Sequence, residues 1–429
     1  MSARTAGPLS FAPFRWLLAA RTVAIVGNAV APIALAFAVL DLTGSAADLG
    51  LVVAARSLAN VAMLLFGGVI ADRLPRNVVL VGTSIAAAAT QGTIAALVLT
   101  GTAGIPALVA LGILNGAVAA VSLPAAAALV PDTVPEDLLR PANAWLRLGL
   151  NAGSIVGASA GAGLIAVVGP GWGLAVDAAA FAVAAVLFSR LRLPDAAAAG
   201  EGAAAAAGTV AGPRAADGDP AGAGPATPTS VFTDLREGWR EFSGRRWIWI
   251  VVLQFAVLNA AFTGAVTVLG PLVADESFGR AGWGLVVAAQ TVGFAAGALL
   301  ALRWRPRRAL GIGVAAMAAA AVPVVALALT PTLPALVAAF ALGGLAIELF
   351  AIAWDQSLQA HVPRAALSRV YSYDMVGSFV AVPLGEILVG PLAHGLGTVP
   401  VLIGCAAVIV IATAAASSSG SVWRIRATA

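Results

Sequence analysis

Residues 49–76 read LGLVVAARSLANVAMLLFGGVIADRLPR, a long apolar run followed directly by a short loop that carries arginines. The apolar part, Leu49–Ala71, is long enough to cross a hydrocarbon core of about 30 Å as a helix that rises about 1.5 Å per residue. Inside lipid the backbone N–H and C=O groups must pair internally, and a helix allows this. The stretch is therefore predicted to be a transmembrane helix that ends at a charged loop.

The same unit, an apolar run and a short polar loop, recurs along the whole chain. Hydrophobic residues make up 60% of the sequence and charged residues 10%, whereas soluble domains carry about 25% charged residues. We therefore expect an all-helical membrane protein with twelve transmembrane helices in two six-helix bundles. The predicted segments are Phe14–Leu40, Leu49–Ala71, Asn77–Thr100, Ile105–Val130, Ala142–Val168, Trp172–Leu191, Trp247–Val273, Gly282–Leu302, Ala309–Thr330, Leu333–Gln356, Tyr373–Pro391 and Thr398–Ala416.

The arginines fix the orientation of these segments. The chain has 24 basic residues, all arginine, and only Arg280 falls in an odd-numbered loop, while Arg21, Arg56 and Arg147 lie inside segments. The others occupy the termini and the even-numbered loops. Because positive charge is retained on the cytoplasmic side, both termini are predicted to be cytoplasmic. This topology also accounts for the net charge of +4, so we expect no nucleic-acid partner.

Other residue types exclude several classes of chemistry. Cys405 is the single cysteine, and His361 and His394 have no partners at metal-ligand spacing. The glycine runs lie within or between the apolar segments, and no Walker motif is present. We therefore expect no enzyme activity, metal or cofactor, and an ion gradient rather than ATP as the energy source.

The middle of the chain separates the two sets of six segments. Residues 194–230 are rich in Ala, Gly, Pro, Asp and Thr, a composition typical of a flexible linker. Apolar residues then recur at near-helical spacing, which favours either an amphipathic helix on the inner membrane surface or a plain connector helix. We expect an N-terminal bundle at 1–193, a cytoplasmic linker at 194–246 and a C-terminal bundle at 247–429. The apolar residues of the linker helix are Phe232, Leu235, Trp239 and Phe242.

The loop after the second segment carries a motif, Gly68-Val69-Ile70-Ala71-Asp72-Arg73-Leu74-Pro75-Arg76. This stretch resembles the signature loop of the major facilitator superfamily, Gly-x-x-x-Asp-Arg-x-Gly-Arg-Arg/Lys. The chain departs from the pattern at Pro75 and Asn77, which replace the second glycine and the last basic residue. The resemblance implies that Gly68, Asp72, Arg73 and Arg76 form a gating loop, in which Asp72 faces the N-terminal end of the eleventh helix. A carboxylate there is favoured by the partial positive charge of the helix end.

A narrower resemblance runs from about Phe14 to Ala416. The stretches at 40–45, 234–239, 348–350 and 367–374 are similar to those of the branch that contains the enterobactin exporter and macrolide-efflux-like proteins. This resemblance implies secondary active export of a small organic molecule, such as a siderophore or a macrolide-like drug, driven by proton entry across the bacterial cytoplasmic membrane. The antiporter pattern is partial, because the fourth segment has no arginine and Ala158 replaces a proline in the fifth.

Charged residues inside the segments are the strongest candidates for function, because each costs roughly 2.5–3.5 kcal/mol to insert at the bilayer centre. The first half holds three cations and the second half three acids, Glu348, Asp355 and Glu386; only Asp177 in the first half breaks this separation. We expect the opposite charges to attract across a central cavity and protonation to weaken this attraction. Arg56 and Glu386 are plausible partners, and Glu348 is the preferred proton carrier, with Asp355 as a relay. A permanently paired, structural Glu348 is the alternative. The three cations are Arg21, Arg56 and Arg147.

Amide side chains provide further candidates for the cavity lining. Asn28 shares a helix face with Arg21, and Gln254 and Asn259 lie in the seventh segment; each of them is predicted either to contact substrate or to bond a neighbouring helix. Glycines at 149, 153, 157 and 161 form a ridge that favours either tight helix packing or a gating hinge. Import of a small metabolite and a receptor or scaffold role without transport remain the alternative functions.

Overall fold

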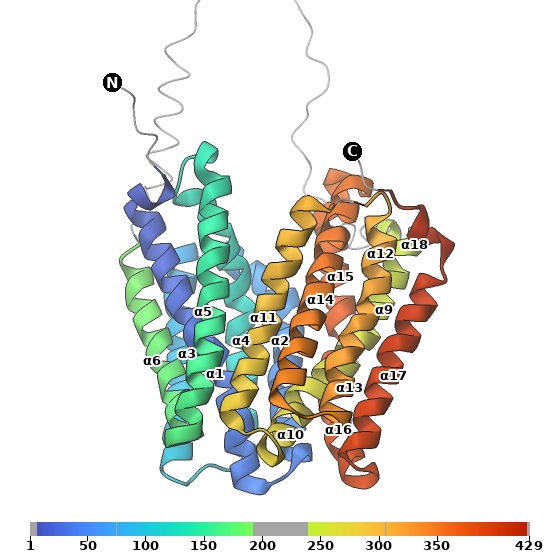
Figure 1. Cartoon of the computed structure of the whole chain (residues 1–429). Coiled ribbons are helices and arrows are strands. Elements are labelled where there is room, and N and C mark those ends of the chain that lie inside the picture. The colour runs from blue at the N-terminus through green and yellow to red at the C-terminus, as the bar shows by residue number, and fades with distance from the viewer. Residues whose placement is uncertain (1–6, 74, 192–238, 305, 427–429) are drawn as a thin grey trace, which may run out of the picture.

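The computed structural model describes residues 7–73, 75–191, 239–304 and 306–426. Within these ranges, 12 spans are long and apolar enough to cross a membrane. Each of the twelve predicted segments coincides with one of them, so the all-helical prediction is confirmed. Figure 1 shows two bundles side by side, with both described ends of the chain on the same side of the molecule.

The first bundle consists of six continuous helices. The glycine at 44 ends the first of them in the left-handed conformation, with φ of 64°, which suits a residue without a Cβ. Pro32 lies within the first helix without breaking it. The helices are α1 (Ala12–Thr43), α2 (Ala46–Arg73), α3 (Arg76–Leu99), α4 (Ile105–Ala128), α5 (Leu139–Val168) and α6 (Pro170–Ser189).

The second bundle contains three interrupted spans, each of which was predicted as a single helix. Proline has no N–H to donate and its ring crowds the carbonyl four residues earlier. Pro271, Pro323 and Pro383 each follow such an irregularity: a π-helix at Gly264–Leu269, a 3₁₀ turn at Met317–Ala320 and a break after Phe379. The helices are α9 (Arg246–Thr263), α10 (Gly270–Glu276), α11 (Arg280–Arg303), α12 (Ala309–Ala316), α13 (Ala321–Leu329), α14 (Leu333–His361), α15 (Arg364–Phe379), α16 (Val382–Leu396), α17 (Thr398–Ser417) and the short α18 (Gly420–Arg424).

The glycine ridge of α5 packs tightly against α1 within the first bundle. A Cβ on Gly157 would lie 2.3 Å from the backbone oxygen of Val26, and one on Gly161 would lie 2.5 Å from the side chain of Val30. The helix runs unbroken past these positions. The ridge therefore serves close packing, and the structure gives no sign of a hinge in α5.

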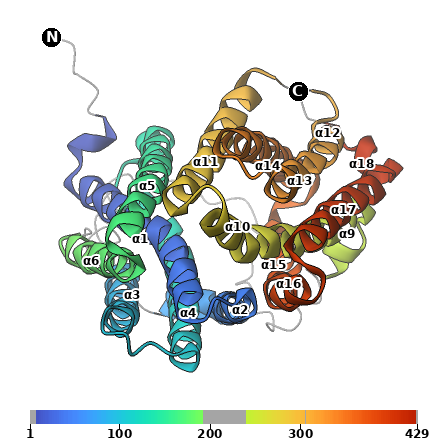
Figure 2. The ribbon, with the colours of Figure 1, turned by 60° about the horizontal axis from the view of Figure 1, so that its bottom comes forward.

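The two bundles touch mainly through the outer halves of four helices. Gly284 of α11 lies against Ala158 and Ala162 of α5, and Gly390 of α16 lies against the start of α2 at Ala46. Toward the cytoplasmic ends, α5 and α11 diverge (Figure 1), and the view from the outer face shows the helices of both bundles converging (Figure 2). The bundles are therefore in close contact on the outer side, and their helices diverge toward the inner side.

The described end of the linker packs on the second bundle. Residues 239–243 are helical, and the rings of Trp239 and Phe242 lie 5.6 Å and 5.8 Å from the ring of Tyr373 on α15. These aromatic residues thus contact protein, whereas the sequence favoured either a helix on the inner membrane surface or a plain connector helix. Glu241 and Arg245 form an ion pair one turn apart, and this pairing lowers the pKa of Glu241. The remainder of the predicted amphipathic helix, with Phe232 and Leu235, lies outside the described residues.

Replacement of Gly284 by valine is expected to open the outer side. A Cβ there would meet the Cβ of Ala162 at 2.1 Å and the backbone oxygen of Ala158 at 2.4 Å, and overpacking of this kind costs about 1–3 kcal/mol. Spin labels are attached at Thr102→Cys and Thr330→Cys, in exposed outer loops of the two bundles, after Cys405 is replaced by serine. Double electron–electron resonance measures the distance between the two labels, which should become longer in Gly284→Val. Gly163→Val is the matched control, since nothing lies within 4 Å of its Cβ position. An unchanged distance in Gly284→Val contradicts the assignment of this contact as an outer seal.

Candidate functional site

The central cavity, of about 390 Å³, lies among the helices of the first bundle and reaches the second. Three of the predicted cavity residues, Arg21, Asn28 and Arg56, line it together. Phe379 and Val382, at the break between α15 and α16, form its wall on the side of the second bundle. Its other polar lining residues are Ser57, Asn60, Thr83, Ser84, Asn115 and Ser122.

Arg56 is held by an amide chain that crosses three helices. Its Nε donates to Oδ1 of Asn115 at 3.0 Å, and Nδ2 of Asn115 donates to Oγ1 of Thr90 at 3.3 Å. Asp177 and Glu386 both attract the guanidinium electrostatically. Arg56 is thus attracted both to an acid of its own bundle, Asp177, and to an acid of the other bundle, Glu386.

Asp177 is a buried acid that sequence reasoning set aside as an exception. It has no exposed surface, Nε2 of Gln91 on α3 donates to its Oδ2 at 2.5 Å, and its Oδ1 has no hydrogen-bond partner. The glycine at position 27 of α1 makes room for it, since a Cβ there would lie 2.8 Å from Oδ1. The sequence shows a carboxylate within an apolar segment, but only the packing of α1, α3 and α6 shows what surrounds it.

Glu386 lies buried where α16 meets α2. Its residue exposure is 2%, its backbone oxygen would lie 2.3 Å from a Cβ on Gly50, and the hydroxyl of Ser57 is near its carboxyl group. Its Oε2 has no hydrogen-bond partner. Among the described residues Arg56 and Glu386 form no direct ion pair, so the two are electrostatic neighbours rather than contacting partners.

The sequence named no particular cation for Glu348, and the structure places Arg147 of the first bundle near it. It is half-buried on α14 beside α11, with its Cβ 2.9 Å from the Cβ position of Gly297. Arg147 of α5 attracts it and Asp355 repels it. Arg147 itself is exposed, at the point where α5 and α11 diverge. The pair therefore faces across the two bundles.

Asp355 directly follows Trp354 on α14 and lines a small second cavity of about 130 Å³ between α9, α14 and α15. Its side chain is exposed, and Oδ1 accepts a hydrogen bond from the hydroxyl of Tyr371 at 3.2 Å. Phe379 belongs to the lining of both cavities. The two cavities are therefore neighbours across the gap between the bundles.

The two amides of the seventh span bond neighbouring helices. Gln254 is buried and its Nε2 donates to Oγ1 of Thr413 on α17 at 3.3 Å, facing a groove away from the central cavity. Asn259 donates from Nδ2 to the backbone oxygen of Ser378 on α15 at 2.9 Å. Of the three amides named from the sequence, only Asn28 lines the central cavity.

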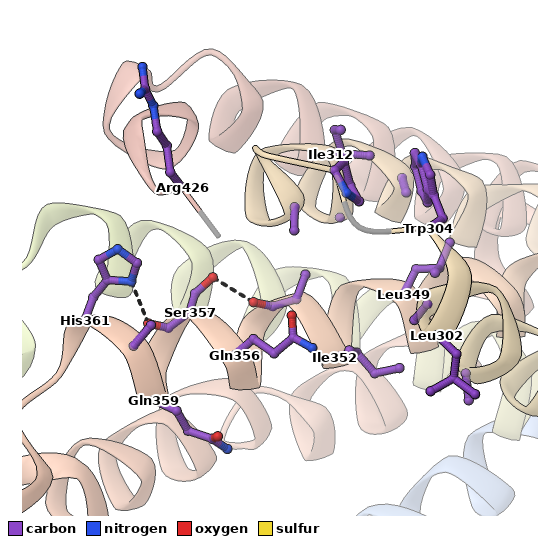
Figure 3. A pocket seen from close by; sticks show the side chains of 18 residues that line it. Leu302, Trp304, Ile312, Leu349, Ile352, Gln356, Ser357, Gln359, His361 and Arg426 are labelled. Atoms are coloured by element: carbon purple, nitrogen blue, oxygen red, sulfur yellow. Dashed lines mark hydrogen bonds between the residues drawn. The ribbon is translucent and has the colours of Figure 1, made fainter. Parts of the chain in front are cut away.

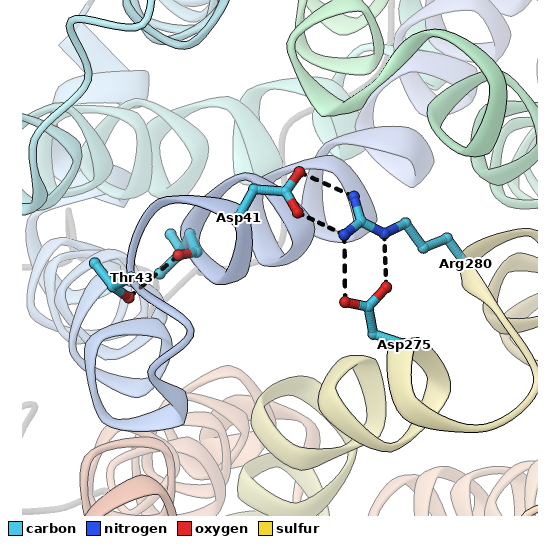
Figure 4. Close-up of polar contacts among 5 residues, drawn as sticks. Asp41, Thr43, Asp275 and Arg280 are labelled. Carbon is cyan, nitrogen blue, oxygen red and sulfur yellow. Dashed lines mark hydrogen bonds and ion pairs between the residues drawn. The ribbon is translucent and has the colours of Figure 1, made fainter.

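An ion-pair clamp closes the outer side (Figure 4). Arg280 at the start of α11 donates from Nη1 and Nη2 to the two carboxylate oxygens of Asp41 at 2.9 and 2.5 Å, and from Nε to Asp275 at 2.8 Å. Its guanidinium also lies 4.8 Å from the ring centre of Phe37. Asp41 lies in the last turn of α1 in the first bundle, whereas Arg280 and Asp275 belong to the second. The single arginine in an outer loop thus joins the two bundles.

The comparisons with known proteins agree with this architecture. The profile described as Major Facilitator Superfamily matches residues 17–299. The chain belongs to the Major Facilitator Superfamily. It is therefore a secondary transporter of small molecules, a multi-pass membrane protein and not an enzyme. No curated protein sequence matches the chain.

Solved transporter structures share the fold at low sequence identity. A mutant of the nucleoside transporter NupG has a TM-score of 0.74 and 14% identity over 94% of this chain and 98% of its own. A bacterial homolog of the human lysosomal transporter Spinster, inward-facing and unoccupied, gives 0.68 and 16% over 97% and 98%. A D-xylose-proton symporter gives 0.62 and 13% over 94% and 95%. These likenesses concern the fold alone.

The family's signature loop falls mostly outside the part that can be described. The side chains of residues 64–74, including Gly68, Asp72 and Arg73, are not among the described residues, so the contact of Asp72 with the eleventh helix stays a prediction. Arg76, which is described, forms an ion pair of 2.8 Å with Asp132, between two cytoplasmic loops of this superfamily member.

A further cavity of about 670 Å³ lies at the inner ends of α11, α12 and α14 (Figure 3). Most of its lining is alanine and aliphatic. Oγ of Ser357 donates to the backbone oxygen of Ala353 at 2.7 Å, and Nδ1 of His361 lies 3.1 Å from the backbone oxygen of Ser357. Ser357 and His361 thus bond within their own helix, and Gln356, Gln359 and Arg426 also line the cavity.

Loss of the clamp is expected to shift the transporter toward an outward-open state. Asp41→Asn removes the bond between bundles, and an ion pair of this partly exposed kind contributes roughly 1 kcal/mol, which corresponds to about a fivefold change in the ratio of states. The spin-label pair at Thr102→Cys and Thr330→Cys measures this ratio. The double variant Asp41→Arg with Arg280→Asp restores the wild-type ratio if the pair acts directly. No recovery in the double variant, or no shift in Asp41→Asn, contradicts the clamp.

Proposed function

We propose that this transporter is a proton-coupled exporter of a small organic molecule in the bacterial cytoplasmic membrane, working by alternating access. The observation that carries the proposal is that acids of the second bundle and cations of the first lie opposite one another: Glu348 near Arg147, and Glu386 near Arg56. Charges in lipid-embedded helices are costly unless they meet partners or water. Such opposed groups suit a role in coupling.

Protonation of these acids changes the attraction between the bundles. An ionised Glu348 favours an arrangement that keeps α14 near Arg147, and a proton on Glu348 cancels this attraction. A change of a few kcal/mol is enough to reverse which of two states prevails, because about 5.5 kcal/mol takes a ratio from 1:99 to 99:1. The buried Glu386 is the second candidate acid, since its contact with α2 must separate when the outer side opens.

A transport cycle follows from the closed outer side and the open inner side. The inward-open form offers the cavity with Arg21, Asn28 and Arg56 to cytoplasmic cargo. Opening of the outer side breaks the clamp at Arg280 and parts α16 from α2, which exposes Glu386 to protons from outside. Return of the protonated protein to the inward-open form releases protons to the cytoplasm, with Asp355 nearest the inner side as a relay.

Export and the kind of cargo are supported by the resemblance to the branch that contains the enterobactin exporter and macrolide-efflux-like proteins. Siderophores and macrolide-like drugs are therefore the first compounds to test. Cells with and without the protein are compared for accumulation of siderophores, macrolides and dyes. Lower accumulation of one of them in expressing cells supports export, higher accumulation supports import, and proteoliposomes that move none of them under a proton gradient favour a receptor or scaffold.

Glu348→Gln is expected to abolish proton-driven transport while leaving exchange intact. Glutamine keeps the size and polarity of the side chain but binds no proton, so the variant cannot couple proton entry to cargo movement. Proteoliposomes loaded with the exported compound are measured with a pH gradient and, separately, in exchange without one. Only the first rate should fall, by at least about tenfold, since general acid–base groups contribute factors of this size or more.

The matched control is Glu136→Gln, which removes an exposed carboxylate from a cytoplasmic turn. It should leave both rates unchanged. Glu348→Gln with normal expression and unaltered gradient-driven transport would remove Glu348 as the carrier. The same two assays on Glu386→Gln then test whether the buried Glu386 is the proton carrier instead.

A further inference from the structure

The second cavity, about 130 Å³ between α9, α14 and α15, combines carboxylates with aromatic walls. It adjoins the central cavity through Phe379, which lines both. Its volume equals that of about four water molecules at roughly 30 Å³ each, which is room for one small substituent of a larger cargo. The lining residues are Val251, Phe255, Phe350, Ala351, Trp354, Asp355, Asp374, Met375, Ser378 and Phe379.

Asp374 is a carboxylate fixed in the wall of this cavity. Nε1 of Trp354 donates to its Oδ2 at 2.8 Å, and Oγ of Ser378 donates to its Oδ1 at 3.1 Å. Two neutral donors orient the group but leave its charge uncompensated. An ionised carboxylate has about four acceptor sites, so both oxygens can accept a further donor from the cavity.

Within the described part of the chain, no cation offsets this charge. Among the described residues neither Asp374 nor Asp355 forms an ion pair, and Asp355 acts on Asp374 as a second negative charge. Two acids that face one cavity without a basic partner give it a negative potential. Low-dielectric surroundings strengthen this potential relative to water.

A stack of aromatic rings forms another part of the lining. The ring centres of Phe255 and Phe350 lie 5.1 Å apart and nearly parallel, and those of Phe350 and Trp354 lie 6.3 Å apart with an angle of 15°. Phe255 stands at the end of this stack, so one of its faces has no ring from the stack against it. An aromatic face attracts a cation within about 6 Å of the ring centre, most strongly where water is excluded.

We propose that this cavity is a subsite for the cationic end of the cargo, a protonated or N-alkylated amine on an apolar organic molecule. Asp374 and Asp355 supply charge, Phe255 supplies an apolar and polarisable wall, and the small volume limits the group to the size of a substituted ammonium. The inference rests on the proposed export of a small organic molecule and narrows its chemical class.

The residues of the neighbouring central cavity indicate how the bound cargo is oriented. Arg21 and Arg56 line that cavity and repel a cation, while Asn28 and Asn60 offer neutral hydrogen-bonding groups. The cationic end is therefore held by the second bundle, and the neutral or anionic remainder of the molecule faces the first. An amine without other polar groups contacts the subsite but not the polar side chains of the central cavity.

Binding of benzyltrimethylammonium to the purified full chain in uncharged detergent tests the proposal, by isothermal titration calorimetry. Neopentylbenzene has the same shape without the charge, and it should bind at least about tenfold more weakly. Asp374→Asn should weaken binding of the cation about tenfold or more, as loss of one member of a buried charge pair does. Asp137→Asn, which removes an exposed carboxylate of a cytoplasmic turn, should not change it.

A second variant guards against a folding defect in Asp374→Asn, whose side chain also orients Trp354. Phe255→Leu keeps an apolar wall and both acids, and it should lower affinity for the cation about fivefold without lowering that for neopentylbenzene. Equal binding of the two probes to the wild type, or no binding of the cation, overturns the proposal without any variant. Undiminished binding by Asp374→Asn also overturns it.

The binding assay uses no membrane and no gradient, so it separates this inference from the proposed function. A protein that binds the cation and moves nothing in proteoliposomes contradicts proton-coupled export alone. A protein that exports under a proton gradient but ignores the cation contradicts the subsite alone.

Discussion

A charge buried in a bilayer must meet a partner or water, and this constraint shapes the whole transporter. It keeps nearly all arginines at the cytoplasmic ends of the helices and places the embedded charges next to polar groups of their own bundle or charges of the other. Arg56 lies near acids of both bundles, and Arg147 lies near Glu348. The electrostatic contacts that satisfy these groups are also those that must change when the bundles rock.

Close backbone packing allows these contacts to form. Lipid tails are as apolar as leucine, so helices in a membrane associate through shape and small residues. Gly50 brings α2 against the backbone of Glu386, and Gly284 brings α11 against α5. At both places a side chain of ordinary size would hold the bundles apart. The outer side is therefore closed both by glycines, whose lack of a side chain lets the helices pack closely, and by the ion-pair clamp at Arg280.

Irregular helices are concentrated in the second bundle, where the proposed substrate subsite lies. The break that follows Phe379 precedes Pro383 and places that ring between the two cavities. In a membrane, interrupted helices are tolerated where protein or a water-filled cavity surrounds the free backbone groups. The first bundle, with continuous helices and a tightly packed α1–α5 pair, is the more regular partner.

The sequence by itself determined the twelve spans, their orientation and the family resemblance, because hydrophobic length and arginine placement are local properties. It also named the embedded charges, and three of the predicted cavity residues do line one cavity. Only the tertiary structure decided which groups bond, such as Asp177 with Gln91 and Asp41 with Arg280, and that Arg147 lies near Glu348. Such pairs join residues far apart in the chain, so their distance depends on how helices pack. The same reason explains why Gln254 could be named as a cavity residue and yet faces α17.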